Sequence, residues 1–72
     1  MRTYYFDLKD GVPVRDKSGV ELASDGVAIE HSRVLAARVR REKPRGDPDL
    51  RIHVVDETGR EVHREHVYPR SI

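Results

Sequence analysis

The chain has 72 residues, which is enough for one small domain and too short for a second one. Leu, Ile, Val and Phe account for 18 of these residues, so the chain has enough apolar side chains to fold rather than stay disordered. There is no Cys, which excludes disulfides and thiolate metal sites. Because so short a chain leaves little structure for a deep pocket, we expect a single non-enzymatic domain over residues 1–72.

Fourteen basic and thirteen acidic residues give a net charge of +1, which is not the strong excess typical of polyanion-binding chains. The charge is unevenly placed, however, since residues 25–46 sum to +3 and residues 47–72 to −2. No apolar stretch approaches the roughly 18 residues of a membrane span, and the N-terminus has no hydrophobic signal region. We therefore expect a cytoplasmic protein with no membrane association.

The first part of the chain is typical of two strands. Tyr4, Phe6 and Leu8 alternate with Tyr5, Asp7 and Lys9, and this period of two predicts a half-buried strand. The pattern further predicts turns at residues 10–11 and 16–19, an extended edge segment around Pro13, and a short strand at residues 20–22.

The middle of the chain predicts one helix that ends before Pro44. Ser24 or Asp25 offers an N-cap, and residues 27–43 contain neither Pro nor Gly. At helical spacing Ala28, Leu35 and Val39 fall on one face, flanked by Val27, His31 and Ser32.

The last part of the chain predicts a hairpin around residues 56–59, with Gly59 in the position that favours positive φ. Asp56 opposite Arg60 sets the register, and Val54 then faces Val62, His53 faces His63, and Arg51 faces Glu65. This register leaves Arg64 and His66 on the face expected to be buried. A bulge near Arg64 that turns Val67 inward is the alternative.

These elements predict an α+β fold with the order strand, strand, helix, strand, strand. A helix on one face of a small antiparallel sheet buries both apolar stripes, and we expect the sheet order 2-1-3-4. The expected core comprises Tyr4, Phe6, Leu8, Leu22, Ala28, Leu35, Val39, Leu50, Ile52, Val54 and Val62.

The predicted pairing of His53 with His63 makes these two residues a candidate pH-sensitive pair. Protonation of both imidazoles would place like charges opposite one another and weaken the hairpin. Two facing imidazoles also suit zinc or nickel, but a structural site needs four ligands and period two points His66 away from His63. A solvated pair without metal is the favoured interpretation.

The end of the predicted helix is basic and forms a candidate nucleic-acid contact. Cations at a helix C-terminus also interact favourably with the helix dipole, and here they spread around the helix. Exposed strand aromatics can stack on bases, but only Tyr5 is expected outside the core. The candidate contact residues are Arg38, Arg40, Arg41, Lys43 and Arg45.

No catalytic or cofactor motif is present. Nearly all of the carboxylates fall in turns or opposite Arg, no glycine-rich phosphate loop occurs, and no Ser, His and Asp arrangement has a supporting motif. We therefore expect no cofactor and no catalytic residues.

Three short motifs resemble a family of small bacterial proteins, common in alphaproteobacteria, that carry a short domain of unknown function. They are Tyr4-Tyr5-Phe6-Asp7-Leu8 followed by Asp10-Gly11, then Asp16 to Leu22 with Gly19 and Glu21, and Asp56-Glu57-Thr58-Gly59-Arg60 after an Ala- and Arg-rich stretch. The resemblance implies a fold and no chemistry. Where it suggests an apolar closing strand, this chain has His63-Arg64-Glu65-His66.

Two functions remain open at this point. The first is a protein-interaction or self-association module, either a homodimer through a sheet edge or a complex with another protein, because unpaired backbone groups at an edge accept a further strand. The second is a weak nucleic-acid-binding protein that uses the basic helix end.

Overall fold

The computed structural model describes residues 1–9 and 16–68. It confirms the predicted order strand, strand, helix, strand, strand of an α+β fold. The turn expected at residues 10–11 and the segment around Pro13 lie outside the described residues. The elements are β1 (Arg2–Lys9), β2 (Val20–Leu22), α1 (Asp25–Glu42), β3 (Arg51–Asp56) and β4 (Glu61–His66).

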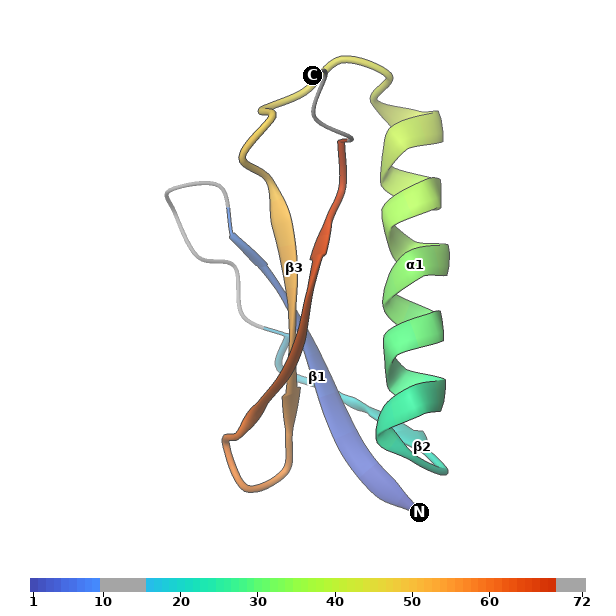
Figure 1. Cartoon of the computed structure of the whole chain (residues 1–72), viewed down its shortest axis with the longest axis vertical. Coiled ribbons are helices and arrows are strands. Elements are labelled where there is room, and N and C mark those ends of the chain that lie inside the picture. Colours follow the sequence, from blue (N-terminus) through green and yellow to red (C-terminus); the bar gives the residue numbers. More distant parts are fainter. Residues whose placement is uncertain (10–15, 69–72) are drawn as a thin grey trace.

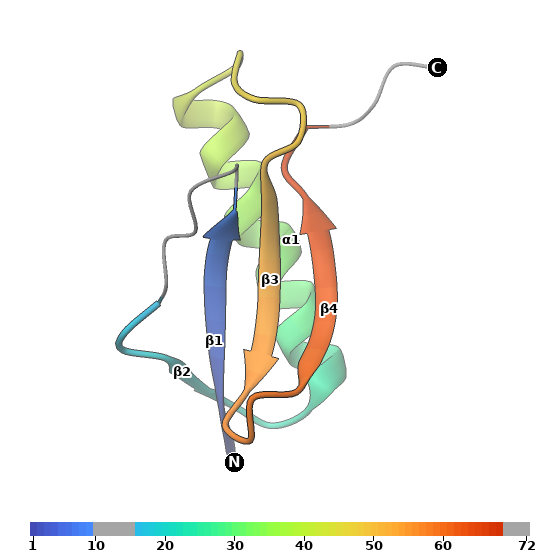
Figure 2. The same ribbon diagram turned by 90° about the vertical axis from the view of Figure 1, so that its left-hand side faces the viewer.

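The four strands form one sheet in the order β2-β1-β3-β4, as predicted, and every neighbouring pair is antiparallel. Helix α1 lies along one face of this sheet (Figure 1). Figure 2 shows the strands in this order from left to right, with α1 behind them. We call the face toward α1 the inner face and the opposite one the outer face.

Helix α1 begins where the sequence predicts, because the Ser24 side chain accepts a hydrogen bond from the Val27 N–H at 3.3 Å. The face that it buries is rotated from the expected one. Its fully buried residues are Ala28, Ser32 and Ala36. Small side chains along this row let the helix approach the sheet closely, so the larger Leu35 and Val39 pack at its margins.

The core matches the prediction for most of its members. Tyr4, Phe6, Ala28, Ile52 and Val54 are buried, and the other expected core residues pack against them partly exposed. Val27, expected beside the buried face, is 44% exposed. The additions are Ala36 and Val67, with exposed fractions of 1% and 0%.

The preferred register of the predicted hairpin is wrong. The alternative, a bulge in the last strand, is correct, although the bulge lies at a different residue. Val54 lies opposite His63 and Val55 opposite Glu61, so Val62 is an extra residue in β4. The bulge therefore lies nearer the turn than Arg64. Its physical reason is the core: the shift buries Val67 on the inner face while Val62 stays in contact with the core.

This shift separates the predicted histidine pair. His53 lies opposite Arg64 on the outer face, whereas His63 lies opposite the buried Val54 on the inner face. Side chains along a strand alternate between the two faces of the sheet, so a bulge that shifts the pairing register by one residue moves His63 to the face opposite His53. The prediction that His53 and His63 face one another is therefore wrong.

Candidate functional site

The hairpin turn is organised by the carboxylate of Asp56. It accepts hydrogen bonds from the Thr58 N–H at 2.9 Å, the Thr58 hydroxyl at 2.6 Å, the Arg60 N–H at 3.0 Å and Arg60 Nε at 3.1 Å. The Thr58 hydroxyl, followed by the donors of Arg60, holds the pKa of Asp56 far below its usual range despite burial. The Asp-x-Thr-Gly-Arg sequence thus has a structural task in this turn.

A second carboxylate ties this turn to the start of α1. Asp25 Oδ1 accepts a hydrogen bond from the Tyr4 hydroxyl at 2.7 Å, and Oδ2 accepts one from Arg60 at 2.8 Å. The bond from Tyr4, with that from Arg60, lowers the pKa of Asp25, and the same bond raises the pKa of Tyr4. Hydrogen bonds among these side chains therefore join strand β1, the start of α1 and the hairpin turn. We call the group the turn network; its members are Tyr4, Asp25, Asp56 and Arg60.

The segment before β2 is held by Asp16. One oxygen of its carboxylate accepts from the N–H groups of Ser18 and Gly19, and the other accepts from the Phe6 N–H at 3.3 Å. Burial raises the pKa of Asp16, but these backbone donors together lower it further. Asp16 therefore covers part of the β1 edge that the short β2 leaves open.

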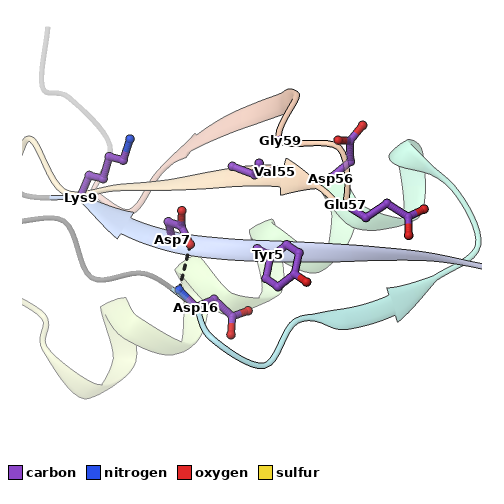
Figure 3. Close-up of a pocket in the computed structure, with 8 residues that line it drawn as sticks. All are labelled: Tyr5, Asp7, Lys9, Asp16, Val55, Asp56, Glu57 and Gly59. Atoms are coloured by element: carbon purple, nitrogen blue, oxygen red, sulfur yellow. Dashed lines mark hydrogen bonds between the residues drawn. The ribbon is translucent and has the colours of Figure 1, made fainter.

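An open hollow of about 510 Å³ lies over β1 and β3 on the outer face. In Figure 3 Asp7 and Tyr5 lie along β1, and the Asp16 N–H donates to Asp7 Oδ1 at 2.9 Å. Asp7, Asp16 and Asp56 accept hydrogen bonds within the fold, so these carboxylates are structural. The hollow is lined by Tyr5, Asp7, Lys9, Asp16, Val55, Asp56, Glu57 and Gly59.

His53 is the buried titratable group of the outer face, with an exposed fraction of 5%. Its Nδ1 lies 2.6 Å from Glu61 Oε1, and the same carboxylate accepts from Arg64 Nε at 2.9 Å. Burial lowers the pKa of His53 and outweighs the opposite effect of Glu61, so the ring is neutral at neutral pH. The bond from Arg64 lowers the pKa of Glu61, which stays ionised.

Two nitrogen atoms on this face are buried without a hydrogen-bond partner. They are His53 Nε2 and Arg51 Nε. Both residues belong to β3 and are two positions apart, so their side chains share the outer face. Most buried polar atoms in folded proteins have hydrogen-bond partners. Two neighbouring atoms without partners therefore make this part of the outer face a candidate binding site.

On the inner face His63 takes part in a separate interaction. Its Nε2 lies 2.8 Å from Glu65 Oε1, and Glu65 Oε1 lies 3.8 Å from Arg33 Nε of α1. These contacts join β4 to the helix, so His63 has a local carboxylate partner where the sequence predicted a second histidine.

The five candidate nucleic-acid contacts do not form one group. Arg40 donates from Nη1 to the Val67 carbonyl at 2.7 Å and so fastens the end of the hairpin to α1. The other four are exposed and form no ion pair within the described residues: Arg38, Arg41, Lys43 and Arg45.

Sequence reasoning missed His53 as a buried group and Arg51 as its neighbour. Period two correctly assigns both to the outer face, which predicts solvent exposure. Burial of His53 depends on its tertiary neighbours, which include Glu61 and Arg64 across the bulged pair of strands, and spacing along the chain does not determine these neighbours. Among residues 1–9 and 16–68, no group of three or more His, Asp or Glu side chains lies together as metal ligands would. No helix of the described chain is long and apolar enough to cross a membrane.

The fold and its surfaces define a small α+β domain with a structural turn network, a charged outer face and, among the described strands, an unpaired edge on β4. Residues 3–67 match a family described as a domain of unknown function (DUF6894), and the chain belongs to this family. The match confirms the resemblance to a short domain of unknown function. No curated protein and no solved structure matches the chain.

Proposed function

We propose that this protein is a non-enzymatic binding module that takes up an extended segment of another protein along β4. One observation carries the proposal: β4 is six residues long, and no described strand pairs with its outer edge. Figure 2 shows β4 at the border of the sheet. Unpaired N–H and C=O groups along such an edge bind an added strand through main-chain hydrogen bonds.

The backbone direction identifies the groups that would bind. The Val67 N–H donates to the Leu50 carbonyl at 3.1 Å, so it points toward β3. Because successive N–H groups in a strand point in opposite directions, the N–H groups of Arg64 and His66 point away from the sheet. These two donors are available to a partner strand.

Charge favours a different protein over a second copy of this chain. Two β4 edges joined by a two-fold axis normal to the sheet place one residue opposite its own copy. Centring on Arg64 or Glu65 sets like charges opposite one another. Arg64 and His66 on the outer face instead favour a partner strand that carries carboxylates opposite them.

The test is a selection of extended peptides from a displayed library on the intact chain. We expect the selected peptides to carry alternating acidic residues and to slow hydrogen exchange of the Arg64 and His66 amides. Arg64→Pro removes an N–H that the sheet does not use and should abolish binding, while Arg64→Ala keeps that N–H and should retain most of it. Peptides that protect other amides, or bind Arg64→Pro equally well, would overturn the proposal.

The four unpaired cations at the end of α1 support nucleic-acid binding as a second candidate. Contacts from Arg38, Arg41, Lys43 and Arg45 to phosphates would make binding to duplex DNA fall with salt, with a logarithmic slope of about −3.6. Fluorescence polarisation with mixed-sequence RNA and DNA measures this slope. Absence of binding at low salt would exclude this candidate without affecting the first.

A further inference from the structure

Three basic side chains lie next to one another across three strands of the outer face. Lys9 in β1 is opposite Arg51 in β3, and Arg51 is opposite His66 in β4. We call these three residues the basic row. Lys9 and Arg51 place like charges directly opposite one another, which destabilises a sheet, and the described residues form no ion pair with any of the three. The row is a place where an anion would relieve repulsion.

The two unpartnered buried nitrogens belong to this row or lie beside it. Arg51 Nε is in the row, and His53 is the next residue of β3 on the same face. Glu61 holds Nδ1 of His53 from the side of the hairpin turn, because Glu61 pairs with Val55. The other ring nitrogen, Nε2, is buried and has no hydrogen-bond partner among the described residues.

The charged groups around His53 come from all three strands. Asp7 and Lys9 face it from β1, Arg51 flanks it on β3, and Glu61 and Arg64 face it from β4. Asp7 already accepts a hydrogen bond from the Asp16 N–H, and Glu61 binds both His53 and Arg64. Helix α1 packs on the opposite face. The cations therefore retain free donors, whereas the carboxylates are occupied.

We propose that the basic row and His53 bind a phosphate group, supplied as inorganic phosphate or as a small phosphate monoester. The Lys9 ammonium and the Arg51 guanidinium supply charged donors for the phosphate oxygens. Neutral His53 supplies a lone pair on Nε2, which accepts a hydrogen bond from a protonated phosphate oxygen. Because Nε2 is buried, the side chains around it must move aside when phosphate binds.

The protonation of phosphate separates it from other oxyanions. Sulfate carries no proton at neutral pH, so neutral Nε2 would face sulfate with a lone pair and repel it. Burial keeps His53 neutral in the free protein, and a bound anion would favour the protonated ring. Phosphate binding should therefore tighten as the pH falls, and the preference for phosphate over sulfate should shrink.

The first experiment uses the full-length chain labelled with nitrogen-15 and follows the His53 ring nitrogens by NMR. Inorganic phosphate, methyl phosphate and sulfate are titrated at constant ionic strength and neutral pH. We expect saturable binding of phosphate about tenfold tighter than that of sulfate. A phosphate monoester has its second pKa at about 6, so methyl phosphate is mostly unprotonated at neutral pH and should bind more weakly there than inorganic phosphate, with the difference shrinking as the pH falls to about 6. Binding of inorganic phosphate alone at both pH values assigns the site to the free ion. Shifts that do not saturate, or equal binding of sulfate, overturn the proposal.

The second experiment uses variants whose folding is checked by the dispersion of their amide signals. Lys9→Gln and Arg51→Gln should each weaken phosphate binding about tenfold, while Arg41→Gln on the exposed helix should leave it unchanged. His53→Gln should remove the preference for phosphate over sulfate. If Arg51→Gln does not fold, Lys9→Gln decides the question alone, and unchanged binding in Lys9→Gln overturns the proposal.

Discussion

The turn network and the basic row lie in one sheet, yet they treat charge in opposite ways. In the turn network Tyr4, Asp25, Asp56 and Arg60 all have partners, and each carboxylate binds more than one donor. In the basic row the described residues form no ion pair with Lys9, Arg51 or His66, and the row lies beside a buried imidazole whose Nε2 has no hydrogen-bond partner. The hydrogen bonds of the turn network are explained by their contribution to stability alone. The basic row and His53 have donors and a ring nitrogen without partners, which a ligand could satisfy.

The carboxylate of Asp56 should give the largest effect, since its loss removes four hydrogen bonds of the turn. We expect Asp56→Ala to lower the melting temperature more than any other single variant below. Glu57→Ala is the matched control, because Glu57 is an exposed residue of the same turn. Thermal denaturation by circular dichroism measures both, and similar melting temperatures for the two variants would show that the turn network contributes little.

Replacement of Gly19, Gly59 or Gly26 by Ala should change the free energy of unfolding by clearly different amounts. Gly19 and Gly59 have positive φ, which costs a side-chain-bearing residue about 1–2 kcal/mol. A Cβ on Gly19 would also lie 2.7 Å from Thr3 Cγ2, whereas a Cβ on Gly59 meets nothing. Gly26 lies in the helix, where Ala should stabilise by about 0.4–1 kcal/mol. Urea denaturation should therefore rank Gly19→Ala as the least stable, followed by Gly59→Ala and then Gly26→Ala.

Substitution of Arg40 should lower the stability of the fold, unlike substitution of the other basic residues at the end of α1. Its hydrogen bond to the Val67 carbonyl predicts that Arg40→Gln destabilises the fold by about 1 kcal/mol. The neighbouring Arg41 is exposed, so Arg41→Gln should leave the free energy of unfolding unchanged. Equal stabilities in urea denaturation would return Arg40 to the group of free cations.

His53 should produce the smallest effect, a change of stability with pH. Burial lowers the pKa of His53 in the folded state below the ordinary value of 6.5, so the unfolded chain binds the proton first. Stability should be constant above about pH 6.5 and fall as the pH drops toward the lowered pKa. Urea denaturation in phosphate-free buffer measures this loss, and His53→Gln should reduce it. Identical pH profiles for the two proteins would contradict the assignment of a buried neutral ring.

Most of the fold could be predicted from local patterns. Period two in residues 4–9, the apolar helix positions after Ser24, and the turn at Gly59 are signals carried by neighbouring residues. The hairpin register is different, since it depends on whether Val62 alone or Val62 and Val67 together contact the core. Burial of apolar side chains of the last strand competes with an uninterrupted register between β3 and β4. Matching of cross-strand side-chain pairs considers only the second of these, so it predicted the wrong register.

The helix face follows the same logic. The predicted face held Ala28, Leu35 and Val39; Ala28 is buried as expected, but the close approach of α1 to the sheet placed Ser32 and Ala36 beside it in place of Leu35 and Val39. Side-chain size decided the contact, because a helix with small residues at its centre can lie nearer the strands.

By itself the sequence determined the elements, their order and the absence of disulfides, because these depend on residue type and spacing along the chain. Only the tertiary structure decided which charges meet. A one-residue bulge in β4 moved His63 to the inner face, set Arg64 opposite His53, and placed His66 opposite Arg51, which pairs with Lys9 on its other side. The reason is geometric: strand side chains alternate between faces, so one extra residue exchanges the neighbours of every position beyond it.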